Sequence, residues 1–222
     1  MDRRDFLARL GRAKGGTPPP EAAQGFGGSA LGEGPGADLG AEFLAQALAV
    51  GCGARRAAGP EEALEMALGL AAGAGAVSVG VHDLGLELNP LLAAAAARAG
   101  LNILPVDDGQ PGAARLIEPL SAGLTRPEAA LAGMGALVQG SRPGGGYLLS
   151  LLPPLHLALV READLLPGLE ELPAALADPA RFTLGPPSVM SIIAGPSKTG
   201  DIEAVMIRGV HGPGRVEVVL FP

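Results

Sequence analysis

From residue 39 onwards the apolar positions follow the periods of regular secondary structure. Between residues 39 and 51 they recur every three or four residues, which predicts a helix. Pro60, followed by two glutamates, is typical of the first turn of a second helix, because proline fits that position and the helix dipole favours acidic side chains. Asn89, as an N-cap, and Gly100, as a C-terminal stop, delimit a third helix.

Short apolar strands alternate with these helices. The segments concerned are residues 54–57, 77–81 and 101–106, and in the second of them valines alternate with small residues, as they do in a strand. Strands that alternate with helices form βαβ units, so this half of the chain predicts a parallel sheet.

The pattern changes after residue 120. Thr125 and Glu128 have the spacing of a capping box and predict a short helix that ends near Gly133. Apolar runs follow at residues 136–139, 147–151 and 156–160, and the glycine-rich loop between the first two is long enough for a hairpin connection. A helix at residues 167–176 and strands at residues 189–193 and 216–221 complete the chain. The predicted fold class is α/β, with a mixed sheet whose parallel βαβ part comes first.

The first 38 residues have a different character. Phe6, Leu7 and Leu10 share one face of a short amphipathic helix, which must dock on its own domain or on a partner to be stable. Of the 30 residues from 11 to 40, 14 are Gly or Pro, which is typical of a linker. We therefore divide the chain into residues 1–38, a short helix and flexible linker, and residues 39–222, the α/β domain.

Composition narrows the class of function. The net charge of −7 disfavours a nucleic-acid partner, which needs a clustered positive field. Cys52 is the only cysteine, so this chain forms no internal disulfide and cannot supply the four thiolates of an ordinary iron–sulfur cluster. The three histidines lack metal-site spacing, and we expect no metal site. With neither an export signal nor an apolar run of about 20 residues, we expect a cytoplasmic protein without a membrane span.

The segment from Gly195 to Glu203 carries the clearest chemical signal. Dinucleotide and P-loop fingerprints are absent from the chain. Here a strand is expected to run through a loop into a helix, and backbone N–H groups, two hydroxyls and one ammonium would suit a carboxylate or phosphate. The residues expected to bind this small anion are Gly195, Ser197, Lys198, Thr199 and Gly200. In the alternative interpretation Thr199 is only an N-cap and Asp201 complements the helix dipole.

Other polar residues are candidates for proton transfer. His211 lies between glycines in a tight turn after the expected helix, and a histidine exchanges protons near neutral pH; a turn histidine bonded to nearby backbone is the alternative. His156 follows two prolines and is a weaker candidate. Two polar pairs, His82-Asp83 and Asp107-Asp108, follow strands, and ligands of open α/β sheets gather at the carboxyl ends of strands.

Three motifs together resemble those of the LUD domain of lactate-utilisation protein C: residues 195–203, residues 209–213 and Leu152-Pro-Pro-Leu-His156. The resemblance is specific over the last seventy residues and extends from about residue 39. It implies a fold similar to the sugar-phosphate isomerase and CoA-transferase-like group. It also implies a role in oxidising L-lactate to pyruvate beside iron–sulfur partner subunits, with no cofactor in this chain. On this basis Thr125 and His156 join the expected ligand-binding residues, with His211 and Asp201 as the expected catalytic or orienting residues.

The chain departs from this family at one place. The family usually shows Gly-Ile-Thr and, some eight residues later, Glu-Thr-Gly-Thr; here Gly123-Leu124-Thr125 keeps the first element, but Gly133-Met134-Gly135-Ala136 replaces the second. The site is therefore altered or weakened, or the change is a neutral one at a buried helix–strand junction. The leading hypothesis is an accessory subunit of a lactate-oxidising system. The alternatives are a stand-alone enzyme for a phosphorylated or CoA-linked substrate, with His211, Asp83 or Asp107 as acid or base, and a non-catalytic interaction module.

Overall fold

The computed structural model describes residues 38–222, apart from residues 108, 142–145, 179–186, 201–205 and 210. By its contacts the chain divides into the units Met1–Leu31 and Gly32–Pro222, and the described residues all belong to the second. The predicted N-terminal helix and most of the predicted linker lie outside the described residues.

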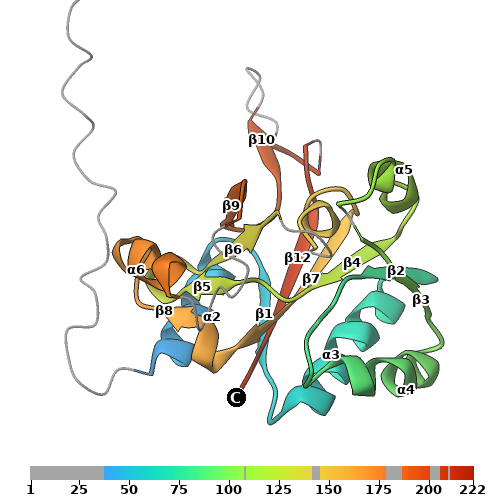
Figure 1. Ribbon diagram of the computed structural model, residues 1–222, viewed down its shortest axis with the longest axis horizontal. Helices are drawn as coiled ribbons and strands as arrows, with labels where there is room; N and C mark the ends of the chain where they lie inside the picture. The colour runs from blue at the N-terminus through green and yellow to red at the C-terminus, as the bar shows by residue number, and fades with distance from the viewer. Residues whose placement is uncertain (1–37, 108, 142–145, 179–186, 201–205, 210) are drawn as a thin grey trace, which may run out of the picture. The chain divides into compact units, whose positions relative to one another are not determined.

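A six-stranded parallel sheet forms the centre of this unit (Figure 1). In spatial order its strands are β1 (Gly53–Arg56), β12 (Arg215–Phe221), β7 (Leu155–Arg161), β4 (Ala122–Thr125), β2 (Ser78–Val81) and β3 (Asn102–Pro105). The α/β class is thus confirmed. Parallel pairing is not confined to the first half, however, because the last strand of the chain pairs parallel with both β1 and β7.

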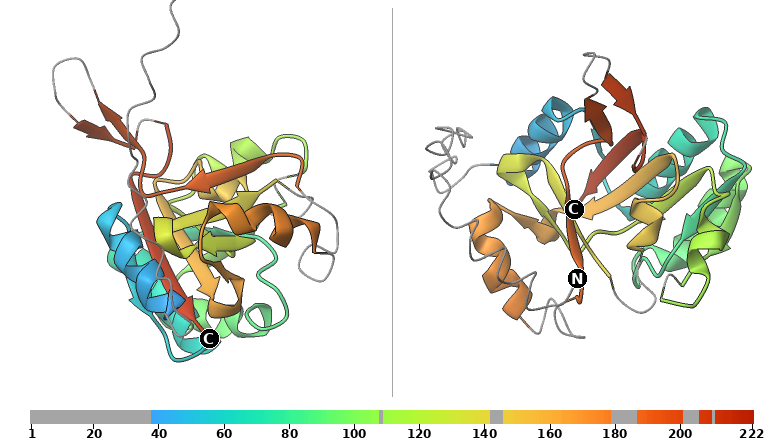
Figure 2. Two further views of the ribbon diagram at one scale, coloured as in Figure 1. Left: turned by 90° about the vertical axis from the view of Figure 1, so that its left-hand side faces the viewer. Right: turned by 90° about the horizontal axis from the view of Figure 1, so that it is seen from above.

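Helices cover both faces of this sheet (Figure 2). On one face lie α3 (Pro60–Gly73) and α4 (Asn89–Ala99), whose small alanines and leucines pack on alternate residues of β2, β7 and β12. On the other face, α2 (Leu39–Ala49) packs through Phe43 and Ala47 on β7 and β12, and α5 (Ala113–Ile117) packs with η2 (Leu148–Ser150) near β4. The helices and strands predicted between residues 39 and 106 are confirmed.

The antiparallel pairings fall in separate, smaller sheets. One has the order β8 (Leu165–Leu166), β5 (Ala129–Leu131), β6 (Ala136–Gly140) and β9 (Met190–Ile193); the other is β10 (Lys198–Gly200) with β11 (Met206–Arg208). The remaining elements are η1 (Ala132–Met134), η3 (Glu162–Asp164), η4 (Leu169–Glu171) and α6 (Leu172–Ala177). Among the described residues, no helix has the length and apolar character that crossing a membrane requires.

Three predictions in the second half are wrong. Thr125 ends the buried strand β4 and does not cap a helix, because the run that follows pairs as β5 with β6. The described residues after Gly195 form no helix: β10 and β11 pair antiparallel, so Thr199 lies in a strand and is not an N-cap. The run at residues 147–151 contains η2 (Leu148–Ser150) and forms no strand.

A fourth correction concerns the start of α4. Asn89 is its first residue, and the side-chain oxygen of Asn89 accepts a hydrogen bond from the backbone N–H of Leu84, at 3.0 Å, so this side chain pins the preceding loop and does not cap the helix. Gly100 does end the helix in the left-handed region, with φ of 68°, as predicted.

Candidate functional site

The order of the strands creates a switch point between β2 and β4. These strands are neighbours, but the chain leaves β2 towards α4 and the edge strand β3, whereas it leaves β4 towards the smaller sheet. In open α/β sheets such a divergence opens a crevice at the carboxyl ends of the strands. Here His82 follows β2 and Arg126 follows β4, and the backbone N–H of Arg126 donates to His82 Nε2 at 3.1 Å.

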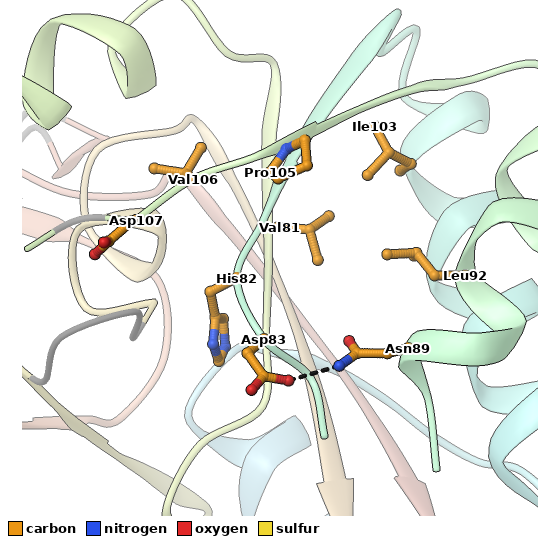
Figure 3. A pocket seen from close by; sticks show the side chains of 9 residues that line it. All are labelled: Val81, His82, Asp83, Asn89, Leu92, Ile103, Pro105, Val106 and Asp107. Atoms are coloured by element: carbon orange, nitrogen blue, oxygen red, sulfur yellow. Dashed lines mark hydrogen bonds between the residues drawn. The ribbon is translucent and has the colours of Figure 1, made fainter. Parts of the chain in front are cut away.

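A cavity of about 560 Å³ lies beside this point, at the carboxyl ends of β2 and β3. Figure 3 shows its apolar side chains, Val81, Leu92 and Ile103, gathered on one side, and the polar groups His82, Asp83 and Asp107 on the other. Asn89, Pro105 and Val106 complete the lining. An apolar wall facing a few convergent polar groups is the usual form of a site for a small molecule.

Asp83 is held in one orientation within this cavity. Its Oδ1 accepts from the backbone N–H of Gly85 at 2.9 Å and from the side-chain amide of Asn89 at 2.6 Å (Figure 3). These two hydrogen bonds hold the pKa of Asp83 below its ordinary value, so the carboxyl is ionised at neutral pH. Both bonds use the same oxygen, which leaves Oδ2 available to accept from a ligand.

Asp107 lines the cavity as a second carboxylate. Its Oδ1 accepts from Gly109 N at 3.0 Å, and its Oδ2 accepts from the amide of Gln110 at 2.9 Å. Two carboxylates and one imidazole make the polar side of the cavity suitable for hydroxyl or ammonium groups more than for an anion.

A second pair of polar side chains, Thr125 and His156, lies deeper in the interior near His82. Thr125 Oγ1 and His156 Nε2 share a hydrogen bond of 2.8 Å, and both side chains are fully buried. Burial, with a smaller contribution from the neighbouring His82, lowers the pKa of His156 to about 3. The imidazole of His156 is therefore neutral at physiological pH. The structure thus brings together Thr125 and His156, which the sequence proposed only separately.

Arginines and carboxylates tie the strand ends together near the cavity. The buried Asp164 accepts from Arg126 at 3.0 Å and from Arg161 at 3.3 Å, and Arg161 also reaches Glu87 at 3.3 Å. Glu87 belongs to the loop between β2 and α4, so the network connects that loop to β4 and β7. Nothing in the sequence marked these residues, because they are far apart along the chain.

The predicted anion-binding segment lies elsewhere, against the end of α2. Lys198 is exposed, and its Nζ donates to Val50 O at 2.8 Å, at the C-cap of that helix, where a cation is favoured. Ser197 N–H donates to Pro213 O at 2.8 Å. Gly195 has a positive φ of 88° and touches the same Val50 carbonyl, where a side chain would clash. The segment is therefore an anchored turn, and its role as an anion site stays a prediction.

The other predicted residues are dispersed. His211 is exposed, Thr199 and Gly200 lie in β10, and Asp201 lies outside the described residues. Within the described residues no group of three His, Cys, Asp or Glu is placed to hold a metal ion. The segment that departs from the family pattern forms η1 and the start of β6; there Gly135, with φ of 58°, contacts the backbone of α2.

A central parallel sheet with helices on both faces defines an open α/β fold, and its polar cavity lies at the carboxyl ends of the strands, where ligands of such folds commonly bind. Within this class the chain belongs to the LUD domain family, whose model matches residues 40–221. The match covers nearly the whole described unit.

Individual relatives agree with this assignment. The chain is 39% identical over 115 residues to lactate utilization protein C of Exiguobacterium sp., a stretch that covers 51% of this chain and 50% of that protein. It is 38% identical over 96 residues to the uncharacterized protein YkgG of Escherichia coli, covering 43% of this chain and 42% of that protein. The chain thus spans about half the length of the curated relatives it matches. A crystal structure of a DUF162 family protein from Deinococcus radiodurans superposes with a TM-score of 0.60 at 24% identity, over 85% of this chain and all of that one, which supports the fold.

Proposed function

We propose that this chain acts in lactate utilisation, as an accessory subunit that works beside iron–sulfur partner proteins and binds a small polar ligand in the cavity next to His82. The main support is the family match over residues 40–221, together with relatives that bear the name lactate utilization protein C. The single cysteine, Cys52, is buried, so clusters in such a system would belong to other chains.

The cavity supplies the proposed contacts with the ligand. Asp83 Oδ2 would accept from a hydroxyl or ammonium group, and the ring of His82 would add a second polar contact. Val81, Leu92 and Ile103 would cover the carbon skeleton. A ligand with both polar and apolar faces fits this division, and a small hydroxylated metabolite has that character.

Complementation tests the role in lactate utilisation. In a strain lacking the gene, the wild-type chain should restore growth on L-lactate as sole carbon source, with growth on glucose as the control. Unimpaired growth of the deletion strain on L-lactate would contradict the proposed role.

Variants of two histidines decide which site matters. His82→Leu removes the imidazole at the cavity, whereas His211→Leu changes an exposed residue of the turn predicted from sequence. We expect the first variant to fail in complementation and the second to succeed, at equal protein levels in immunoblots. Lys198→Ala tests the anchored turn separately, and loss of growth with this variant alone would move the site to that segment.

A stand-alone enzyme is the second candidate, favoured by the placement of an imidazole and two carboxylates around one cavity. A thermal-shift screen of the purified chain with phosphorylated and CoA-linked compounds tests it, because a saturating ligand raises the melting temperature. Turnover of a responding compound that disappears in His82→Leu would favour this function over the accessory role.

A further inference from the structure

Two fully buried side chains carry polar atoms without hydrogen-bond partners. Gln139, on β6, is 1% exposed and its Oε1 has no partner; His156, on β7, is 0% exposed and its Nδ1 has none among the described residues. A buried polar atom left without a hydrogen bond costs about 1–3 kcal/mol, so such atoms are rare unless something else satisfies them.

Both side chains face the interface between the large sheet and the smaller sheet. Side chains alternate along a strand, so Gln139 lies on the same side of β6 as Leu137. Leu137 packs in one core cluster with Ala158 and Val160, which lie on the same side of β7 as His156. The two unpartnered atoms therefore belong to the same layer of the molecule.

Further polar groups lie near each of them. Ser191 of β9 is the register partner of Gln139, and its hydroxyl shares a hydrogen bond of 3.2 Å with the hydroxyl of Tyr147. Tyr147 immediately precedes η2, which packs on β4 and β7, the strands that carry Thr125 and His156. Polar side chains from β4, β6, β7 and β9, together with Tyr147 before η2, thus lie on or beside the facing sides of the two sheets.

The residue before Tyr147 links these polar groups to the cavity. Gly146, beside Tyr147, lies so close to the ring of His82 that a side chain there would overlap it. His82 lines the cavity, so the cluster begins directly behind the cavity's polar side.

We propose that Gln139, His156 and Thr125 form an inner polar subsite that takes a small uncharged molecule or group bearing hydroxyls. Gln139 Oε1 needs a donor. His156 Nδ1 needs a donor or an acceptor, according to whether Nε2 donates to or accepts from Thr125. A hydroxyl can serve in either sense, which a carboxylate cannot. An anion is disfavoured because the imidazole is neutral and the cluster's other members, an amide and three hydroxyl groups, carry no positive charge.

The proposal concerns binding alone and holds whether or not the chain acts in lactate utilisation. Its test uses the full chain with ¹⁵N-labelled histidine, which gives signals from only three residues. The two probes are (S)-propane-1,2-diol and sodium L-lactate, which share a three-carbon skeleton with a hydroxyl at C2 but differ in charge. We expect the diol to shift the His156 Nδ1 resonance saturably and L-lactate to leave it unchanged.

The matched variants are Gln139→Leu and Gln46→Leu, the second on the partly buried side of α2. Losing one hydrogen bond should weaken diol binding about tenfold in Gln139→Leu and leave it unaltered in Gln46→Leu. If Gln139→Leu fails to fold, the wild-type titration still decides. No saturable shift with the diol would overturn the proposal, and a shift with L-lactate alone would overturn the assignment to uncharged ligands. If the deletion strain grows normally on L-lactate but the diol shifts the His156 resonance, the role in lactate utilisation is rejected and the proposed subsite is supported.

Discussion

Replacing Gly123 by alanine would make the added methyl group overlap the backbone of η2. Gly123 is buried in β4, in register with His156, and a Cβ built on it lies under 3.0 Å from the carbonyl oxygen of Leu149, closer than real Cβ atoms come. The obstacle is backbone, so η2 must shift as a whole, and Leu149 is itself fully buried. Overpacking of this kind costs about 2–3 kcal/mol. For a domain of this size that corresponds to a melting temperature lower by about 5–10 °C.

Gly69 provides the matched control. It lies inside α3, no atom outside the neighbouring backbone of that helix lies within 4 Å of the position that an alanine methyl group would take there, and its φ is not positive. Gly69→Ala should therefore stabilise the protein by about 0.5–1 kcal/mol, because alanine loses less backbone entropy in a helix. Both variants are measured by urea denaturation followed by circular dichroism. A Gly123→Ala variant as stable as the wild type would refute the close packing of η2 on β4.

Buried polar groups give three further predictions. The pKa of His156 is about 3 in the folded protein, so the unfolded state binds more protons between pH 3 and 6.5. Protonation of this residue should therefore lower the free energy of unfolding by about 1.5 kcal/mol when the pH falls from 6.5 to 5. This loss should disappear in His156→Gln and persist in His211→Gln. Burial raises the pKa of Cys52 to about 11, so its reaction with a disulfide reagent at pH 8 should be about 100-fold slower in the folded protein than in urea; equal rates would show that the thiol is exposed. Glu217 is 4% exposed and is bonded to two arginines. Glu217→Gln should therefore lower the free energy of unfolding, measured by urea titration, by about 1–2 kcal/mol. The control Glu118→Gln, on the surface, should change it by less than about 0.5 kcal/mol.

The fold was predictable where local signals agreed with tertiary structure. Pro60 and Gly100 mark helix ends through their own backbone restrictions. Val79 and Val81 of β2 are buried as their period predicts, whereas Val77, just before the strand, is exposed. The helix predicted from the capping-box spacing at Thr125 does not form. The hydroxyl of Thr125 instead shares a hydrogen bond with His156, on a strand thirty-one residues further along the chain, and the flanking residues pair as strands. Local hydrogen-bonding potential is the same in both cases, so the sequence could not distinguish them.

The site was harder to predict because it depends on strand order. The His82-Asp83 and Asp107-Asp108 pairs were recognised as strand ends, but only the topology places β2 beside β4 and creates the switch point there. The segment at Gly195 looked richer, since it gathers glycine, hydroxyls and an ammonium group in one run. In the fold its ammonium group bonds to the end of α2, and the described residues where a helix was expected, whose N–H groups would have held an anion, form the antiparallel strands β10 and β11.

The charged groups divide by how their hydrogen bonds are used. Asp164 and Glu217 are buried carboxylates, and each is bonded to two arginines that remain partly in water, so both act as ties between strands. The oxygens of these carboxylates are already used by the arginines and are poorly placed to accept hydrogen bonds from a ligand. Asp83 differs because both of its bonds converge on Oδ1, which fixes the side chain and leaves Oδ2 without a bond among the described residues, in the cavity that His82 also lines. A carboxylate that is both ionised and oriented needs no rearrangement to receive a donor, which makes Asp83 the carboxylate of this cavity best prepared for binding.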